Sequence, residues 1–356
     1  MSEDPDRAKL IRFLVEQGAS AAELEEAQAT GTLGPLALEL AIRSRGERMT
    51  FAEAAKRAGL ELDYAAAVWR ALGFPDPLLD AAPDLTEDEA ATLELLARMA
   101  GPVFGQETTL QLARVIGGSV AQIAEAIVDA FRITQEMPRR ASGEPSSTIV
   151  GDYARMAGAM IPVLGSAITD TLAAHLVTVS RAGWALDAAG ATVTRERAVG
   201  FVDLVDFTSR TRLLAPAELA ATIGSFETLV ADLVSRAGGR LVKLIGDEAM
   251  FVIGDPAGAC RLAVELHGAL ARQPEGPQAR IGLAAGPVVS HRGDYFGDVV
   301  NLAARLVKVA EPGAVLVSAP LATALDGWAL TPVEVPPLKG YDEPVPAYRL
   351  ELPKSR

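Results

Sequence analysis

The stretch FVDLVDFT, at residues 201–208, ends a predicted strand and turns the chain toward a helix. Asp203 stands where the strand is predicted to end, and a carboxylate in that place can hold a hard divalent cation. The free backbone N–H groups of the helix start, which includes Phe207 and Thr208, can face phosphate oxygens. An aspartate before a helix is more often only a cap. The meaning of the stretch therefore depends on the polar residues that follow it.

The chain around this stretch alternates strands and helices. Apolar periodicity and turn signals predict helices at 216–237, 256–272 and 298–310, and strands at 198–205, 240–245, 248–253, 280–290, 314–318, 328–335 and 346–351. Gly246-Asp247, between two of these strands, is a hairpin signal. The order predicts an α+β fold, a ferredoxin-like α/β sandwich with its helices on one face of the sheet.

The first half of the chain has helical spacing and little β-branched clustering. We therefore predict three parts, namely an all-helical domain at 1–180, a linker at 181–197 and the sandwich domain at 198–356. A polar segment rich in Pro, Ser and Gly, 137–149, is predicted to separate two helical stretches. The apolar run 156–169, which Pro162 interrupts, has 14 residues without a charge, whereas a membrane span needs roughly 20. We expect a buried helix there and no membrane span.

Composition limits the classes of function. Apolar residues make up 49% and charged residues 22% of the 356, which is typical of a globular protein with two or three domains. The net charge of −13 argues against general binding of nucleic acid. The single cysteine, Cys260, allows no internal disulfide, and the acidic, polar start lacks the features of a secretory signal. Both observations favour the cytoplasm.

Two short helices predicted near residues 51–58 and 63–72 are spaced like a helix-turn-helix. Thr50 and Glu53 form a capping-box pattern at the first of them, and Gly59 ends it. Binding to DNA would need an excess of cations, but residues 41–80 contain six Lys or Arg and six Asp or Glu. We interpret the pair as a packing motif and keep a DNA-binding regulator as the alternative hypothesis.

Two carboxylates are predicted to meet at one edge of the sheet. Asp247 lies at the tip of the hairpin, and Asp203 ends the neighbouring strand if the first three strands are adjacent. A pair of carboxylates with a polyphosphate makes a suitable Mg²⁺ or Mn²⁺ site, since Mg²⁺ usually takes few protein ligands. By itself, Asp247 is more often a turn residue.

Further polar residues follow in a suggestive order. Lys243 lies inside an otherwise apolar strand, where a lysine is rarely buried without a partner, and Asp294 lies in a later loop. Asn301 and Arg305 are four apart and share one face of a predicted helix. An arginine that reaches a phosphate is a common device for stabilising a phosphoryl transition state. Each of these residues alone also suits an ordinary exposed surface.

Taken together, the motifs resemble the catalytic domain of class III nucleotidyl cyclases. The resemblance covers about residues 195–352 and rests on FVDLVDFT, VKLIGDEAMFV, GDYFGDVVNLAAR and PLKGYDEPV. It implies that Asp203 and Asp247 bind two Mg²⁺ or Mn²⁺ ions per site, with the backbone carbonyl of Leu204 as a further ligand. The family usually has glycine where this chain has Asp206, whose charge would stand near the triphosphate.

The same resemblance assigns the residues that contact the nucleotide. Lys243 and Asp294 would select the base, Asn301 would orient the ribose, and Arg305 would stabilise the transition state at the α-phosphate. Lys339 resembles the lysine that contacts the terminal phosphates. A lysine donor with an aspartate acceptor fits the edge of adenine, which offers an acceptor at N1 and a donor at its amine. The expected reaction is conversion of ATP to 3′,5′-cyclic AMP and pyrophosphate.

The family places its site between two catalytic domains, with the metal acids from one and the other groups from its partner. One chain here carries both sets, so the resemblance implies a homodimer with two shared sites. A phosphoryl transferase that resembles a polymerase is a further alternative, since it would also use two metal ions. It would need a basic groove for its template, which an acidic chain does not favour.

The helical half resembles the N-terminal regulatory domain of actinobacterial, pH-responsive cyclases, notably in FAEAAKRAGL and WRALGFPDP. We expect an autoinhibitory module there, controlled by pH or lipid. His175 is its candidate sensor, because histidine changes charge near neutral pH. A histidine packed in the core is the alternative.

Overall fold

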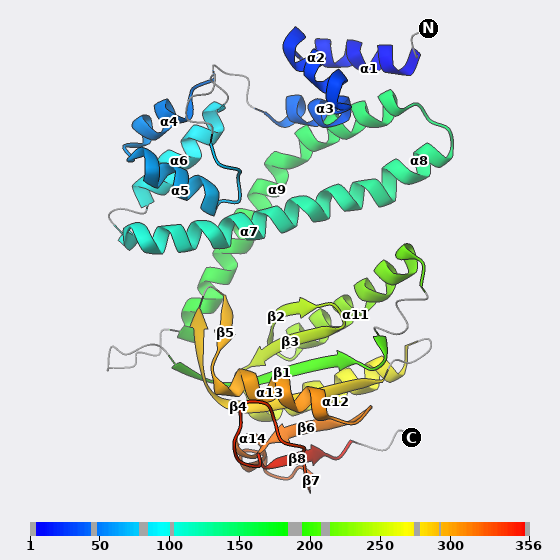
Figure 1. The fold of residues 1–356 in the computed structure, drawn as a ribbon. Coiled ribbons are helices and arrows are strands. Elements are labelled where there is room, and N and C mark those ends of the chain that lie inside the picture. The colour runs from blue at the N-terminus through cyan, green and yellow to red at the C-terminus, as the bar shows by residue number, and fades with distance from the viewer. Residues whose placement is uncertain are drawn as a thin grey trace. The chain divides into compact units, whose positions relative to one another are not determined.

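The computed structural model describes residues 5–43, 48–77, 85–99, 103–183, 194–207, 214–273, 278–291 and 293–352. The chain divides into two compact units, Met1–Leu186 and Asp187–Arg356. In the described ranges the first unit is helical and the second combines a mixed sheet with helices (Figure 1). The predicted α+β class with a helical N-terminal region is confirmed.

The helical unit contains two small cores joined by long helices. Its elements are α1 (Pro5–Glu16), α2 (Ala21–Thr30), α3 (Leu33–Ile42), α4 (Phe51–Ala58), α5 (Leu62–Ala71), α6 (Glu87–Met99), α7 (Gly105–Phe131), a π-helical turn (Arg132–Glu136), α8 (Met137–Ala141) and α9 (Ser146–Gly183). Helices α1 to α3 pack against the start of α9, and α4 to α6 form the second core around Phe51, Trp69 and Leu93. The predicted break at 137–149 is shorter in the structure, because α8 occupies its start and α9 begins at Ser146.

The helix-turn-helix-like pair forms as predicted, with its capping box. The Thr50 hydroxyl accepts a hydrogen bond from the Glu53 N–H at 3.2 Å, and the Glu53 carboxylate accepts one from the Thr50 N–H at 2.8 Å. Arg57 is held by Glu87 and Glu94 of α6. This cation therefore serves contacts within the unit, which agrees with a packing motif.

The apolar run in α9 is not buried, and the prediction of a buried helix there is wrong. Five of its large side chains are 36–69% exposed, and the helix continues through Pro162 (Met156, Met160, Ile161, Val163, Ile168). Only the start of α9, at Ile149 and Ala154, is covered by described parts of the chain. By length and mean hydropathy (1.4) alone, Ser146–Ser180 is one described helix that is long enough to cross a membrane, and one such helix does not establish a membrane span.

The second unit is built on a mixed sheet with the strand order β2-β3-β1-β4-β6-β8-β7, and β5 pairs with β4. The strands are β1 (Thr194–Leu204), β2 (Arg240–Ile245), β3 (Glu248–Ile253), β4 (Ala279–His291), β5 (Asp294–Phe296), β6 (Val315–Ser318), β7 (Leu330–Val333) and β8 (Ala347–Leu350). The helices are α11 (Pro216–Arg236), α12 (Pro256–Ala271), α13 (Asp298–Val309) and α14 (Ala319–Thr323). Only β4 and β6 pair in parallel among these strands.

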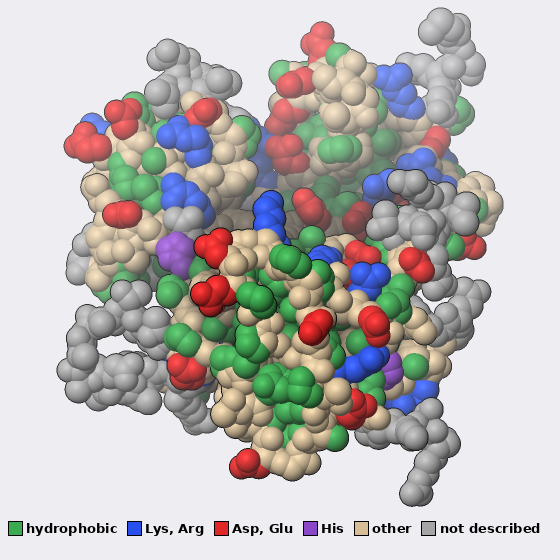
Figure 2. Space-filling view, turned by 60° about the horizontal axis from the view of Figure 1, so that its bottom comes forward, with side chains coloured by type: hydrophobic (Ala, Val, Ile, Leu, Met, Phe, Trp, Pro, Cys, Tyr) green, Lys and Arg blue, Asp and Glu red, His purple; other side chains and the backbone are tan. Residues whose placement is uncertain are grey.

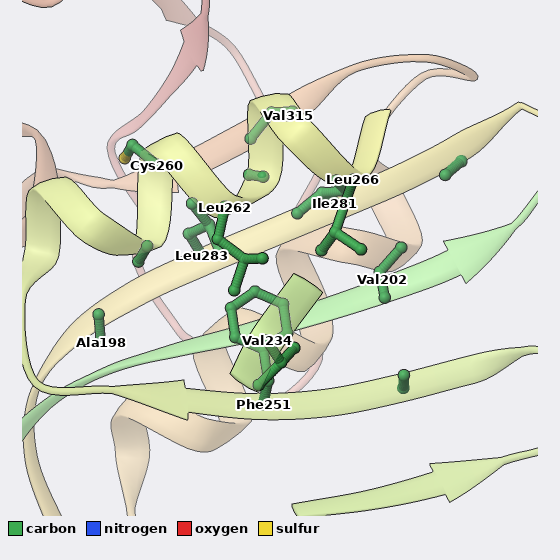
Figure 3. Close-up of a cluster of buried hydrophobic side chains, with 14 of the residues drawn as sticks. Ala198, Val202, Val234, Phe251, Cys260, Leu262, Leu266, Ile281, Leu283 and Val315 are labelled. Carbon is green, nitrogen blue, oxygen red and sulfur yellow. The ribbon is translucent and has the colours of Figure 1, made fainter. Parts of the chain in front are cut away.

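Helices cover both faces of this sheet, so the predicted placement on one face is wrong. Figure 3 shows one face, where Val202, Phe251 and Ile281 meet Val234 of α11 and Leu262 of α12. Alternate strand residues point the other way and pack against α13 in a second cluster (Val199, Phe201, Met250, Val252, Ala284). Residues at both odd and even positions along these strands are buried, as expected for a sheet that is covered on both faces.

Helix α13 lies unusually close to β4 because of Gly282. A Cβ atom at this position would lie 2.4 Å from the Val307 nitrogen and 2.5 Å from the Ala303 oxygen, both backbone atoms of α13. No side chain fits between strand and helix at this point. The position of α13 is thus fixed by contact with backbone, and α13 carries Asn301 and Arg305.

Candidate active site

The structure brings the two predicted metal acids together at the ends of adjacent strands. Strands β2, β3 and β1 are neighbours, and the Leu204 N–H donates to the Asp247 carbonyl at 3.2 Å, which joins the hairpin tip to the end of β1. Asp203 is buried there. Burial, and then the negative charge of Asp203, raises the pKa of Asp247. Two carboxylates that repel each other in a sheltered place favour a bound cation.

The donor set at this edge suits a hard divalent ion that also binds phosphate. Among the described residues, no three His, Cys, Asp or Glu side chains gather closely enough to hold an ion by themselves. Mg²⁺ is often bound by one or two carboxylates plus substrate phosphates, so Asp203, Asp247 and the Leu204 carbonyl are a sufficient protein contribution. These residues therefore fit Mg²⁺ or Mn²⁺.

The two predicted base-selecting residues form an ion pair. Lys243 Nζ lies 2.6 Å from the Asp294 carboxylate, which also accepts a hydrogen bond from the Tyr295 N–H at 2.8 Å. Burial works to raise the pKa of Asp294, but the bonds from Lys243 and Tyr295 outweigh burial, and the net shift is downward. A hydrogen-bond donor and an acceptor thus stand side by side, a pattern that complements the acceptor at N1 and the donor at the amine of adenine.

Arg240 holds this pair in place, and the sequence analysis did not single it out. Its guanidinium donates to the Gly293 carbonyl at 2.8 Å and lies 5.9 Å from the centre of the Tyr295 ring. A bulge between Leu241 and Lys243 puts Arg240 and Lys243 on the same face of β2, although a regular strand would put them on opposite faces. The sequence did offer a signal for the role of Arg240, because Arg240 and Lys243 are two cationic residues separated by two positions in an otherwise apolar strand.

Side-chain hydrogen bonds connect helix α13 to the loop that carries Lys339. Arg305 Nε donates to the Lys339 carbonyl at 3.4 Å. The Tyr341 hydroxyl donates to the Asp298 carboxylate at 2.6 Å, and burial together with this bond raises the pKa of Tyr341 to about 12. The predicted phosphate lysine and transition-state arginine therefore belong to one connected group, and Asn301 lies one turn before Arg305 with its side chain exposed.

The turn after β1 is fixed by backbone contacts. The Val205 N–H donates to the Gln278 carbonyl at 2.8 Å, and Asp206 has φ 60°, a left-handed conformation in which glycine is the usual residue. Phe207 begins a helical turn, and its side chain packs on the hydrophobic core. Thr208, predicted to face phosphate, lies outside the described residues.

His175 lies on α9 with its side chain exposed. The alternative of a histidine packed in the core is therefore wrong. Its neighbours one turn away, Leu172 and Val179, are also more than half exposed, at 57% each.

Comparison with known proteins finds matches for both halves of the chain. Residues 3–179 match the family model of the adenylate cyclase regulatory domain, and residues 191–351 match that of the adenylate and guanylate cyclase catalytic domain. An adenylate cyclase of Streptomyces coelicolor is 36% identical, over 82% of this chain and 76% of its own length. This chain belongs to the class III adenylate cyclases.

Two further proteins are similar to this cyclase. A pH-sensitive adenylate cyclase of Mycobacterium tuberculosis is 29% identical, over 90% of this chain and 80% of its own length. The crystal structure of the adenylyl cyclase CyaB from P. aeruginosa has 20% identity and a TM-score of 0.42, and the match covers 46% of this chain and 96% of that one. The cyclase thus joins a regulatory to a catalytic domain, and as an adenylate cyclase it is a lyase that makes cyclic AMP.

Proposed function

We propose that this adenylate cyclase acts as a homodimer with two shared active sites. The proposal is supported by the different contacts that two cationic side chains of α13 make. Lys308 contacts Asp203 of its own protomer at 3.4 Å, whereas Arg305 contacts the Lys339 carbonyl. Within one protomer the transition-state arginine is thus engaged away from the metal acids, and a second protomer would supply the missing half of each site.

In this proposal the acids of one protomer bind the cations. Asp203, Asp247 and the Leu204 carbonyl would hold two Mg²⁺ or Mn²⁺ ions, which supply activation of the ribose 3′-oxygen and neutralise phosphate charge when bound. Asp203 is buried at the end of β1, and the hairpin tip is joined to this end by the hydrogen bond from the Leu204 N–H to the Asp247 carbonyl. No protein side chain is needed as a dedicated base.

The other protomer binds and orients the nucleotide. Lys243 donates to N1 of adenine, and Asp294 accepts from the amine. Asn301 orients the ribose so that its 3′-oxygen lies in line with the α-phosphorus. Arg305 donates to the α-phosphate oxygens, where charge grows in the transition state. Lys339 neutralises the terminal phosphates, and pyrophosphate leaves.

The first test is nucleotide and metal dependence. Purified full-length cyclase with Mn²⁺ should convert ATP to cyclic AMP, and GTP should react at least about tenfold more slowly because the Lys243–Asp294 pair presents the wrong edge to guanine. A chelator such as EDTA should stop the reaction. Equal rates with both nucleotides would contradict the base assignment, and a rate unaffected by EDTA would contradict the metal mechanism.

We also propose that the helical domain inhibits the catalytic domain and responds to pH. The exposed apolar side chains of α9 support a helix whose environment changes between states, and His175 stands among them. The charge of −13 agrees with an enzyme that does not bind nucleic acid. On the face drawn in Figure 2, Lys and Arg side chains lie among Asp and Glu without forming a broad basic area among the coloured residues.

Removing residues 1–190 is expected to raise the rate several-fold and to flatten its dependence on pH. The catalytic unit has its own hydrophobic core, so the shortened protein should fold. Rates of cyclic AMP formation from pH 5.5 to 8.5 for both proteins provide the measurement. His175→Asn in the full chain is the matched variant, which removes only the imidazole. An unchanged rate and profile after deletion would refute inhibition by the helical domain.

A further inference from the structure

Helix α13 carries a second cationic residue, Lys308, that the proposed reaction does not use. Lys308 follows Arg305 by three positions, so the two side chains leave neighbouring sides of the helix. Lys308 Nζ lies 2.5 Å from the Glu248 carboxylate and 3.4 Å from Asp203 Oδ1. One ammonium group therefore bridges two carboxylates, and one of these is the predicted metal ligand at the end of β1.

The two contacts differ in a way that matters for metal binding. Glu248 is the directly opposite partner of Asp203 in the pairing of β1 with β3, so the two carboxylates start from adjacent backbone positions. Their side chains are only 16% and 12% exposed, while that of Lys308 is 51% exposed. The short bond holds Lys308 to Glu248, and the long one lies at the limit of hydrogen bonding. Lys308 can therefore release Asp203 and keep Glu248.

The local charge explains why such a cation is needed. Asp203, Asp247 and Glu248 place three carboxylates at one edge of the sheet, and the Lys308 ammonium is the cation within 4 Å of two of them among the described residues. Without it, three neighbouring negative charges would attract any divalent ion strongly. When Lys308 is present, its positive charge neutralises part of this negative charge within the protomer, so the attraction for a divalent ion is weaker.

We propose that Lys308 is an internal counter-ion that weakens binding of free metal to the empty site. Metal would then enter mainly together with the nucleotide, whose phosphates add the missing negative charge and ligands. Lys308 acts through Asp203 and does not touch the substrate, so it is a positioning residue. The inference rests on the proposed function, in which Asp203 holds the metal.

The experiment is a titration of nucleotide-free, full-length cyclase with Mn²⁺, followed by electron paramagnetic resonance of the free ion. Lys308→Met should bind Mn²⁺ about tenfold more tightly, since a positive charge next to a ligand has been removed. Lys308→Arg, the matched control that keeps the charge, should stay within about twofold of the unaltered protein. Glu248→Gln should bind Mn²⁺ more weakly, because Lys308 is then left to pair with Asp203 alone.

The nucleotide provides a second readout that a purely structural role would not change. With the non-cleavable analogue α,β-methylene-ATP bound, the difference between Lys308→Met and the unaltered protein should shrink to about threefold or less, since the phosphates then dominate the charge at the metal. Unchanged or weaker Mn²⁺ binding by a folded Lys308→Met protein would overturn the inference. If the Asp203→Asn protein bound Mn²⁺ as tightly as the unaltered protein, the metal site itself would be wrong, and the inference would fall with it.

Discussion

Arg305→Ala and Asp203→Ala should each lower cyclic AMP formation about 10²–10³-fold, and mixing the two inactive proteins should restore activity. The loss at Arg305 has the size seen when one donor to a developing negative charge is removed, and the loss at Asp203 reflects removal of a proposed metal ligand. In a shared-site homodimer, the heterodimer has one site in which both altered residues fall together and one in which neither does. Random exchange makes half of the dimers heterodimers, so about a quarter of full activity should return.

Matched pairs of variants distinguish shared sites from general stabilisation by mixing. Arg305→Ala and Asn301→Ala lie on the same helix and belong to the same half of the site, so every mixed dimer of these two lacks an intact site. Their mixture should stay inactive. The rate of cyclic AMP formation after co-refolding or co-expression is the measurement. Recovery in both mixtures, or in neither, would contradict the shared site.

Reversing the hydrogen-bonding pattern of the base pocket should change the preferred nucleotide. Lys243→Glu alone should lower kcat/KM for ATP about 10³-fold, because it removes the donor to adenine N1 and sets two carboxylates where a 2.6 Å ion pair stood. Lys243→Glu combined with Asp294→Asn places an acceptor near the ring N–H of guanine and a donor near its carbonyl oxygen. This double variant should favour GTP over ATP.

The control for this change is Lys243→Met, which removes the donor without supplying an acceptor. It should lose activity with ATP and gain none with GTP. The values of kcat/KM for both nucleotides, with Mn²⁺ present, provide the test. A double variant that still prefers ATP would show that groups other than Lys243 and Asp294 select the base.

The elements of the second unit were predictable because their sequence signals agree with one another. Strands β2 and β3 form at the predicted residues, since an apolar run, Gly246-Asp247 and a second apolar run all indicate a hairpin. Helix α13 also forms as predicted, because its apolar residues recur at helical spacing and Gly297 precedes it. Strongly periodic segments with clear turn residues are the ones that sequence determines best.

The features that were missed depend on contacts between distant segments. The bulge in β2 puts Lys243 on the same face as Arg240, and no residue type in the local sequence indicates that a bulge forms there. The exposure of α9 escaped prediction because apolar spacing indicates a face that needs cover without indicating what covers it. The bridge from Lys308 to Glu248 joins residues 60 positions apart, so only the fold brings them together.

The missing side chain at Gly282 has a consequence for how the cyclase can vary. Because main-chain atoms of α13 contact β4 directly at this point, the distance between helix and strand cannot be adjusted by exchanging one apolar residue for another. Even a methyl group at position 282 would push α13 away from β4 and so displace Asn301, Arg305 and Lys308 together. New chemistry on this scaffold should therefore arise by changing the outward-facing groups of α13, while the spacing below it stays constant.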